Sequence, residues 1–275
     1  MFENIIKNVH NRHPLIHCIT NYVSINDCAN IVLACGGAPI MAEDINEVSQ
    51  ITSICQGLDI NIGMLNDNKL SSMLKAGATA NELGIPVILD PVGAGSSDYR
   101  IKAVQNLMSN VQFGVIRGNV SEIKAIAAKQ GIHNIAAGVY ETMQKNKSAM
   151  GVEAGIADKI TDDNIKEMAD FINKLSQKTG AVIAVTGRID MVADENRVYA
   201  IRNGHKMMSL VTGAGCQLSA LTSAYVAADK EHILESVCAA VSVMGISGEL
   251  AYRRMAEVDG NASSVSYTHL TLPTK

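Results

Sequence analysis

The organisation of the chain is set out by one stretch, Pro86-Val87-Ile88-Leu89-Asp90-Pro91-Val92-Gly93-Ala94-Gly95. Its first apolar residues run on without polar alternation, which is typical of a parallel strand covered on both faces. An acid and then a glycine-rich segment follow where the strand ends. Open α/β sheets bind their ligands at the carboxyl ends of such strands. The stretch therefore predicts a buried parallel strand and a functional site at its end.

Further apolar runs give strand candidates on either side of this one. Together the candidates are residues 15–19, 38–41, 58–62, 86–89, 113–116, 181–185, 191–193 and 198–201. Helical periodicity fills most gaps: Ser24 precedes one helix, Asn66 opens another and Thr161 caps a third. Strands that alternate with helices predict an α/β fold, with a mostly parallel sheet between helices. The last two runs, joined through residues 194–196, predict a β-hairpin.

The composition is that of a globular chain. Of 275 residues, 47% are hydrophobic and only 18% are charged, which excludes a disordered chain. The formal net charge of −4 gives no general attraction to nucleic-acid backbones or anionic membranes. The sequence has no uninterrupted apolar run of about 18 residues and no signal-peptide pattern. We therefore expect a cytoplasmic protein that binds neither nucleic acid nor membrane.

The cysteine spacing and the segments without a helix or strand pattern indicate how the chain divides into domains. The six cysteines form no C-x-x-C pair and no zinc spacing, so buried free thiols are expected. No repeat or biased linker divides the chain, and residues 1–262 are expected to form a single domain. Residues 134–160 are the least patterned and predict a loop with a weak helix. Residues 263–275 match no helix continuation and are assigned no function.

A second glycine-rich stretch, Val211-Thr212-Gly213-Ala214-Gly215-Cys216, precedes a helical segment at 217–228. Two glycines at this spacing let backbone N–H groups turn toward one point, and the helix adds its positive end. The resulting anion pocket suits the charge on a transferring phosphoryl group. The stretch matches neither the dinucleotide fingerprint nor the P-loop. Taken alone, it also fits a glycine-rich turn that enters a core helix.

Other groups with phosphate or metal chemistry follow predicted strands. Asp90 can hold Mg²⁺ or cap the next loop. Arg117 can neutralise a phosphate, and Glu122 can position metal-bound water or complete a helix cap with Asn119. Thr186 offers a hydroxyl or ends its strand in an ordinary turn. Because a purely structural domain rarely gathers all these groups at strand ends, they predict one site.

The order of these motifs resembles the ribokinase-like superfamily: D-P, then N-x-x-E, then T-G, then a glycine-rich anion hole. That anion hole usually ends in Asp, the catalytic base, whereas Cys216 stands here, as in the hydroxyethylthiazole kinases. The resemblance covers about residues 5–260 and implies a three-layer α/β/α fold with a mostly parallel central sheet. Two segments are similar to those that line the thiazole pocket of that family, His17-Cys18-Ile19-Thr20-Asn21-Tyr22-Val23 and Gly36-Gly37-Ala38-Pro39-Ile40-Met41-Ala42.

The resemblance implies an activity as well. The γ-phosphoryl group of ATP would pass, with Mg²⁺, to the primary alcohol of 4-methyl-5-(2-hydroxyethyl)thiazole in thiamine biosynthesis or salvage. Alternatives are another ribokinase-like kinase of a vitamin-precursor alcohol, such as a pyrimidine alcohol or pyridoxal, and a nucleotide-dependent NAD(P)H-hydrate dehydratase. A non-catalytic sensor is a third class. Family members form homotrimers with the thiazole pocket at subunit contacts, and the same is expected here.

By position, the resemblance assigns residues to the thiazole pocket. Met41 and the backbone of Gly213 would contact the thiazole, and Asn21 and Val23 would be further pocket residues. From the residues alone, Met41 also fits a core methionine, and Asn21 also fits a local turn hydrogen bond. His17 is expected to be a packing histidine.

The resemblance assigns the nucleotide side in the same way. Arg117 and Thr186 would bind ATP, Asp90 would support Mg²⁺ and the phosphates, and Glu122 would support Mg²⁺. Cys216 would sit at the base position, with the N–H groups of the segment Gly213, Ala214, Gly215 and Cys216 as the anion hole. Ala214 replaces the threonine that is usual in the family. At a helix N-terminus the pKa of the Cys216 thiol is expected to be lowered.

Overall fold

The computed structural model describes residues 2–132 and 160–257. The expectations for residues 134–159 and for residues 263–275 lie outside these ranges. In the described part, one sheet has the strand order β2-β1-β3-β4-β5-β6-β7-β8. Its strands are β1 (Leu15–Ile19), β2 (Ala38–Ile40), β3 (Gly57–Asn61), β4 (Val87–Asp90), β5 (Val115–Asn119), β6 (Val182–Thr186), β7 (Asp190–Ala193) and β8 (Val198–Ile201).

The sheet is mostly parallel, as predicted. Strands β1 to β6 pair in parallel. Strand β7 pairs antiparallel with β6, and β8 pairs antiparallel with β7. All eight predicted strands are present, with ends that differ by at most three residues. The hairpin of β7 and β8 is confirmed: Asp194 Oδ1 accepts hydrogen bonds from the backbone N–H groups of Asn196 and Arg197 and so closes the turn.

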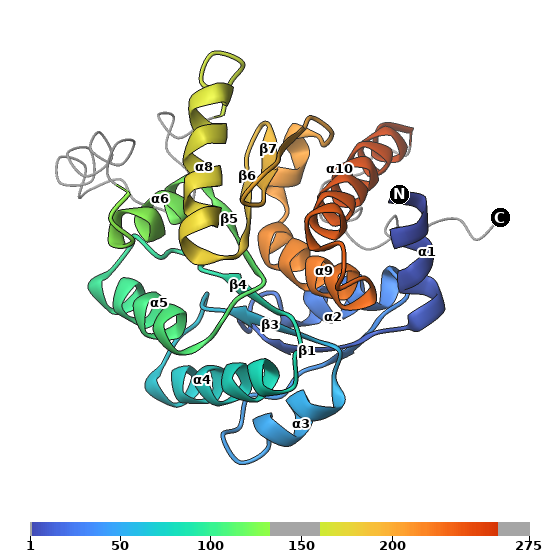
Figure 1. Cartoon of the computed structure of the whole chain (residues 1–275). Coiled ribbons are helices and arrows are strands. Elements are labelled where there is room, and N and C mark those ends of the chain that lie inside the picture. Colours follow the sequence, from blue (N-terminus) through green and yellow to red (C-terminus); the bar gives the residue numbers. More distant parts are fainter. Residues whose placement is uncertain (1, 133–159, 258–275) are drawn as a thin grey trace.

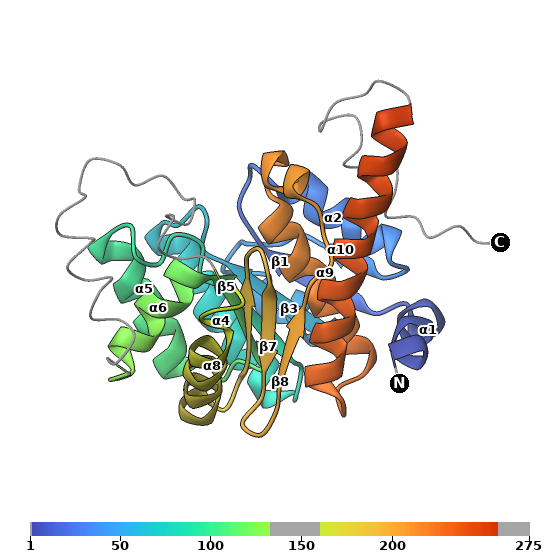
Figure 2. The ribbon, with the colours of Figure 1, turned by 90° about the horizontal axis from the view of Figure 1, so that it is seen from above.

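Helices cover both faces of the sheet, which confirms the three-layer α/β/α prediction (Figure 1; Figure 2). A separate apolar core fills the space on each side of the sheet. One layer consists of α3 (Val48–Ile54), α4 (Asp67–Glu82), α5 (Asp98–Asn110), α6 (Val120–Lys129) and α8 (Ile165–Thr179). The other consists of α1 (Phe2–Arg12), α2 (Ile25–Ala34), α9 (Ala214–Ala228) and α10 (Ile233–Glu257), with the 3₁₀ helix η2 (Lys206–Leu210) before α9.

Two of the three predicted helix starts are confirmed. Ser24 is the N-cap of α2, and Asn66 is the N-cap of α4, where its Oδ1 accepts from Lys69 N at 2.9 Å. The prediction for Thr161 is wrong. Helix α8 starts at Ile165 after Asn164, whose Oδ1 accepts from Thr161 N at 2.8 Å. Residues 161–164 therefore form a turn. All four of these residue types can cap a helix, so the sequence alone does not show which one does.

Helix α9 forms the middle of its layer. Every residue from Cys216 to Ala228 is buried, and the helix contacts β1, β3 and β4 as well as α1, α2 and α10 (Figure 1). Its approach to the sheet is close: a Cβ on Gly57 would lie 3.2 Å from the Ala227 Cβ. No residue of α9 is charged, and a helix without a charged face toward water is stable only when it is enclosed in this way. All six cysteines of the chain are free and buried, as expected.

Helix α10 is the one helix among the described residues that is long and apolar enough to cross a membrane. Most of its apolar window, 61%, is buried inside the protein. It packs on α9 and along β7. A core helix passes the same test of length and composition, so this feature is weak evidence for a membrane span.

Asp59 is a buried acid in β3 that the sequence reading does not single out. It is 0% exposed, and neither carboxyl oxygen has a hydrogen-bond partner within residues 2–132 and 160–257. Burial, and then the charge of Asp90, raise the pKa of Asp59 well above its usual value, against a smaller opposite effect of Arg117. The neutral form of this carboxyl is therefore favoured in the folded protein.

Candidate active site

Four parallel strands end side by side at one edge of the sheet, and each brings a polar residue there. The register aligns Asn61 of β3 with Asp90 of β4, and Asn119 of β5 with Thr186 of β6. Helix α9 starts at the same edge, where Ser219 in its second turn donates a hydrogen bond to Asp90. This edge therefore collects the strand-end groups in one place.

Asp90 is fully buried among these groups. Its Oδ2 accepts from Asn61 Nδ2 at 2.7 Å and from Ser219 Oγ at 2.9 Å, and Arg117 Nη1 lies 3.7 Å away. Burial raises the pKa of Asp90, although Arg117, Ser219 and Asn61 act in the opposite direction. Its Oδ1 has no partner in the described part of the chain. A buried carboxyl oxygen without a partner is one that Mg²⁺ or metal-bound water can use.

Arg117 joins β5 to β6 and to the start of α9. Its Nη2 donates to Thr186 Oγ1 at 2.7 Å, and its Nε has no partner among the described residues. A Cβ on Gly215 would lie 2.8 Å from Arg117 Nη1. Glycine at this position thus leaves room for the guanidinium beside the helix terminus, and the structure brings Arg117, Thr186 and Gly215 together.

Glu122 is a helix cap at the same edge. Its Oε2 accepts from Asn119 N at 2.8 Å, and Asn119 Oδ1 accepts from Glu122 N at 2.9 Å, which completes the capping box of α6. Its Oε1 accepts from Gly93 N at 2.9 Å in the loop after β4. Burial, and then the charge of Asp90, raise the pKa of Glu122 to about 7. The capping interpretation is confirmed, and the carboxylate also holds the Gly93 loop.

The turn before α9 has the form that the glycine-rich stretch predicts. Gly213 is the N-cap residue with a φ of 76°, in the left-handed region that favours glycine, and it provides no side-chain cap for the helix. Ala214 N donates to the Val211 carbonyl oxygen at 3.3 Å, so the N–H groups of Gly215 and Cys216 are the ones in the first turn that are suited to an anion. A Cβ on Gly213 would lie 2.7 Å from Ser24 Cβ, so this turn packs directly against the loop after β1.

Cys216 lies in that first turn and is buried. Asn21 Nδ2 donates to Cys216 Sγ at 3.1 Å and to Asn61 Oδ1 at 3.2 Å. The expected lowering of the thiol pKa is wrong. Burial raises the pKa of Cys216, the charge of Asp90 raises it further, and the hydrogen bonds of nearby side chains act against this. The helix terminus alone does not outweigh the loss of water, so the thiol form is favoured at neutral pH.

The sequence as a whole matches one family. The profile described as the hydroxyethylthiazole kinase family matches residues 6–268. The chain belongs to this family. The hydroxyethylthiazole kinase of Clostridium acetobutylicum is 51% identical over 267 residues, which cover 97% of this chain and 92% of the relative. That of Ruminiclostridium cellulolyticum is 44% identical and covers 96% of this chain and 87% of the relative.

Solved structures agree with this membership. A hydroxyethylthiazole kinase protein from Pyrococcus horikoshii OT3 superposes with a TM-score of 0.81 at 30% identity, covering 98% of this chain and 92% of that one. A ribokinase-like superfamily protein from Enterococcus faecalis V583 superposes with a TM-score of 0.61 at 11% identity, covering 97% and 87%, and supports the fold alone. The ribokinase-like fold and the kinase class that the sequence predicts are confirmed.

The residues that the hydroxyethylthiazole kinase resemblance places at the thiazole differ in their surroundings. Asn21 contacts Cys216, and its Oδ1 accepts from Ser24 N and Oγ at 3.1 Å, so the local turn hydrogen bond is confirmed. Met41 is partly buried against the core cluster that includes Cys216. Val23 is 67% exposed and lies on the surface of its loop.

The sequence patterns did not identify several of the side chains that organise this edge. Asn61 and Ser219 hold Asp90, and Arg100 donates to the carbonyl oxygens of Ile62, Gly63 and Val92 in the loops beside it. Asn61 ends a strand as Asp90 does, so the same strand-end rule would have found it. Ser219 lies three residues after Cys216 on the same helix face.

The packing interpretation of His17 is confirmed. This buried ring lies between Thr52 Oγ1 at 2.9 Å and the carbonyl oxygen of Ala42 at 2.8 Å. Both ring nitrogens are thus occupied by structural partners. Because these partners tie β1 to α3 and to the loop after β2, His17 contributes to the shape of the pocket rather than to its chemistry.

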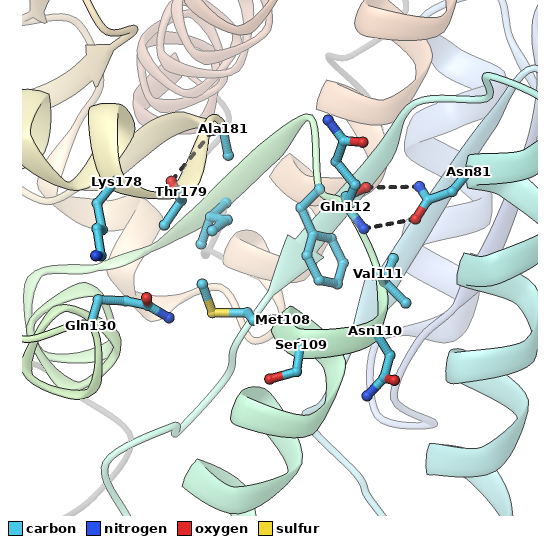
Figure 3. A pocket seen from close by; sticks show the side chains of 12 residues that line it. Asn81, Met108, Ser109, Asn110, Val111, Gln112, Gln130, Lys178, Thr179 and Ala181 are labelled. Atoms are coloured by element: carbon cyan, nitrogen blue, oxygen red, sulfur yellow. Dashed lines mark hydrogen bonds between the residues drawn. The ribbon is translucent and has the colours of Figure 1, made fainter.

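A cavity of about 500 Å³ lies away from these groups (Figure 3). It is at the opposite edge of the sheet, where β5 and β6 begin and α5, α6 and α8 end. Its lining has no carboxylate, thiol or imidazole; it includes Asn81, Met108, Gln112, Gln130, Lys178 and Thr179. We therefore place the candidate active site at the carboxyl edge and not at this cavity.

Proposed function

We propose that the chain transfers the γ-phosphoryl group of ATP to the primary alcohol of 4-methyl-5-(2-hydroxyethyl)thiazole, in thiamine biosynthesis or salvage. The observation that carries the proposal is the Cys216 thiol beside Asn21, in a helix turn that also lies against Arg117. One side of this turn suits an alcohol, and the other side suits a triphosphate. Phosphoryl transfer needs little more from a protein than such positioning and charge stabilisation.

The nucleotide would lie on the β5–β6 side. Arg117 and Thr186 would bind its phosphates, and the N–H groups of Gly215 and Cys216 would stabilise charge on the transferring group. Among the described residues, no group of three His, Cys, Asp or Glu side chains could hold a metal ion by itself. Asp90 Oδ1 nevertheless suits Mg²⁺, which is commonly held by one or two carboxylates together with phosphate oxygens and water. The ion would neutralise phosphate charge, with Glu122 holding the adjacent loop.

Thiol chemistry at position 216 gives a first prediction. Because the transition state is loose, a base contributes less than the hundredfold or more that is typical of general base catalysis. We expect Cys216→Asp to retain or raise kcat and Cys216→Ala to lower it by about tenfold or less. Steady-state kinetics with the thiazole alcohol checks both. A complete loss in both variants would contradict the role given to the thiol.

The guanidinium of Arg117 gives a second prediction. Arg117→Ala is expected to raise the KM for ATP by about 10- to 100-fold, because charge-assisted hydrogen bonds to phosphate are lost. The matched control is Arg197→Ala, which removes an arginine that pairs with Asp194 and Glu235 at the β7–β8 hairpin. An unchanged KM for ATP in Arg117→Ala would remove this residue from the nucleotide site.

The decisive assay combines ATP, Mg²⁺ and the thiazole alcohol and identifies the product by mass spectrometry. A phosphate ester of the thiazole supports the proposal. Nucleoside diphosphate formed from hydrated NAD(P)H, without a stable phosphorylated product, would favour the dehydratase alternative. A panel with a pyrimidine alcohol and pyridoxal tests the other kinases, and nucleotide binding without turnover would indicate a sensor.

The state of the protein is part of the proposal. Residues 1–262 would form one kinase domain, and residues 263–275 would have no role. The enzyme would work in the cytoplasm, which suits six buried free thiols. It would be a homotrimer with the thiazole pocket at subunit contacts. Exposed Tyr22 (51%) and Val23 (67%) beside the pocket suit such a contact, and light scattering measures the oligomer directly.

A further inference from the structure

Lys69 is a buried cation at a helix position that disfavours a positive charge. It is the third residue of α4, and its side chain is only 2% exposed. A positive charge in the first turn of a helix is repelled by the positive end of the helix dipole. Burial of an ammonium group is also costly unless the charge is paired. Its place therefore has to be explained by the groups around its Nζ.

Those groups come from two loops that the sequence separates. Lys69 Nζ donates to the Thr20 carbonyl oxygen at 2.5 Å, in the loop after β1. It forms an ion pair with Glu43 Oε2 at 2.8 Å, in the loop after β2. It also lies 4.5 Å from the centre of the Tyr22 ring, whose hydroxyl donates to Glu43. One ammonium group thus joins both loops to the start of α4.

The joined loops carry the residues placed at the thiazole. Thr20 precedes Asn21, whose amide contacts the Cys216 thiol at 3.1 Å. Glu43 follows two residues after Met41. The fit around Asn21 is tight, because a Cβ on Gly63 would lie 2.8 Å from Asn21 Nδ2. A shift of the Thr20 carbonyl therefore moves the amide that faces Cys216.

We propose that Lys69 is a positioning residue for the alcohol substrate, which fixes the Asn21 and Met41 walls of the pocket relative to Cys216. This inference rests on the proposed function, because it takes those walls as the thiazole site. A buried ion pair contributes little net stability but can select one arrangement of the groups around it. In this protein, the ion pair would fix the position of the loop after β1 relative to the loop after β2.

Lys69→Met tests the inference. Methionine retains much of the apolar stem, and Glu43, with a side chain 40% exposed, can be solvated when its partner is removed. The fold is therefore expected to persist, with a thermal midpoint close to that of the wild type. The KM for the thiazole alcohol should rise about tenfold while the KM for ATP stays unchanged, since only one side of the site loses its support.

Two further variants separate positioning from general damage. Lys7→Met removes an exposed lysine paired with Glu3 on α1 and should change neither KM. Glu43→Gln should raise the thiazole KM in the same direction as Lys69→Met, and the double variant should show less than the product of the two effects.

The possible outcomes are distinct. An active wild type whose Lys69→Met variant keeps its thiazole KM, or raises both KM values equally, would overturn this inference and leave the proposed function standing. A wild type that forms no thiazole phosphate would overturn the proposed function, and the inference would be rejected with it.

Discussion

Gly213→Ala is expected to lower kcat/KM for thiazole phosphorylation by about 100-fold or more, since small misplacements of catalytic groups have effects of this size. The added Cβ would lie 2.7 Å from Ser24 Cβ, at a φ of 76° where side chains are strained. Ser24 donates to Asn21, so relief of the clash moves the first turn of α9 or the Asn21 loop. Either movement separates the anion-binding N–H groups from the alcohol side.

The matched control for this prediction is Gly180→Ala. Gly180 has a φ of 72°, and a Cβ there would meet nothing within 4 Å. Both variants therefore carry the strain of a left-handed alanine, on the order of 1 kcal/mol, but only Gly213→Ala has a clash at the site. The left-handed strain should lower the thermal unfolding midpoint of both variants by a similar small amount. Equal activity in the two variants would show that the α9 turn is not where phosphate is bound.

Asp59→Val is expected to raise the free energy of unfolding at pH 7 by about 1–4 kcal/mol, the gain seen when buried ion pairs are replaced by apolar residues. The carboxyl is fully buried, and neither oxygen has a partner in the described part of the protein. Valine also suits a parallel strand covered on both faces. Denaturant unfolding of Asp59→Val and of the wild type measures the difference in their free energies of unfolding.

The pH dependence gives this prediction its sign. The folded-state pKa of Asp59 is raised, so the folded protein keeps a proton that the unfolded chain releases above about pH 4. The contribution of this group to stability is complete below that pH and is lost as the pH rises toward the folded pKa. The gap between Asp59→Val and wild type should therefore widen from pH 4 to pH 7. Asp59→Asn should remove that pH slope with a smaller gain, because its amide is still unpaired. A gap that stays constant with pH would contradict a protonated Asp59.

The fold could be predicted because its strands are buried on both faces. Such strands appear as short apolar runs, and 15–19 and 198–201 have the observed ends. Strands β4, β5 and β6 run past their predicted ends because polar residues continue them: β5 extends through Arg117 to Asn119. The error at Thr161 has a similar cause, since several adjacent residues can cap a helix and only the backbone decides which one does.

The site could be predicted in part. Asp90, Arg117 and Thr186 lie in the last residues of parallel strands and the Gly213 turn begins a helix, so parallel order alone brings them to one edge. The order of strands in the sheet is not visible in a sequence, which is why the Asn61–Asp90 contact was missed. Lys69 was missed because its partners lie on loops whose conformations depend on tertiary contacts.

The enclosure of α9 has a consequence for protein synthesis. On the ribosome, all the parallel strands emerge before residues 214–228, so the middle of one face of the growing sheet, over β1, β3 and β4, lacks its covering helix until then. Apolar surface exposed at that stage is where nascent chains aggregate or recruit chaperones. Codon choice and pausing in the last third of the message should therefore affect yield more than they do earlier, although the finished enzyme would be the same.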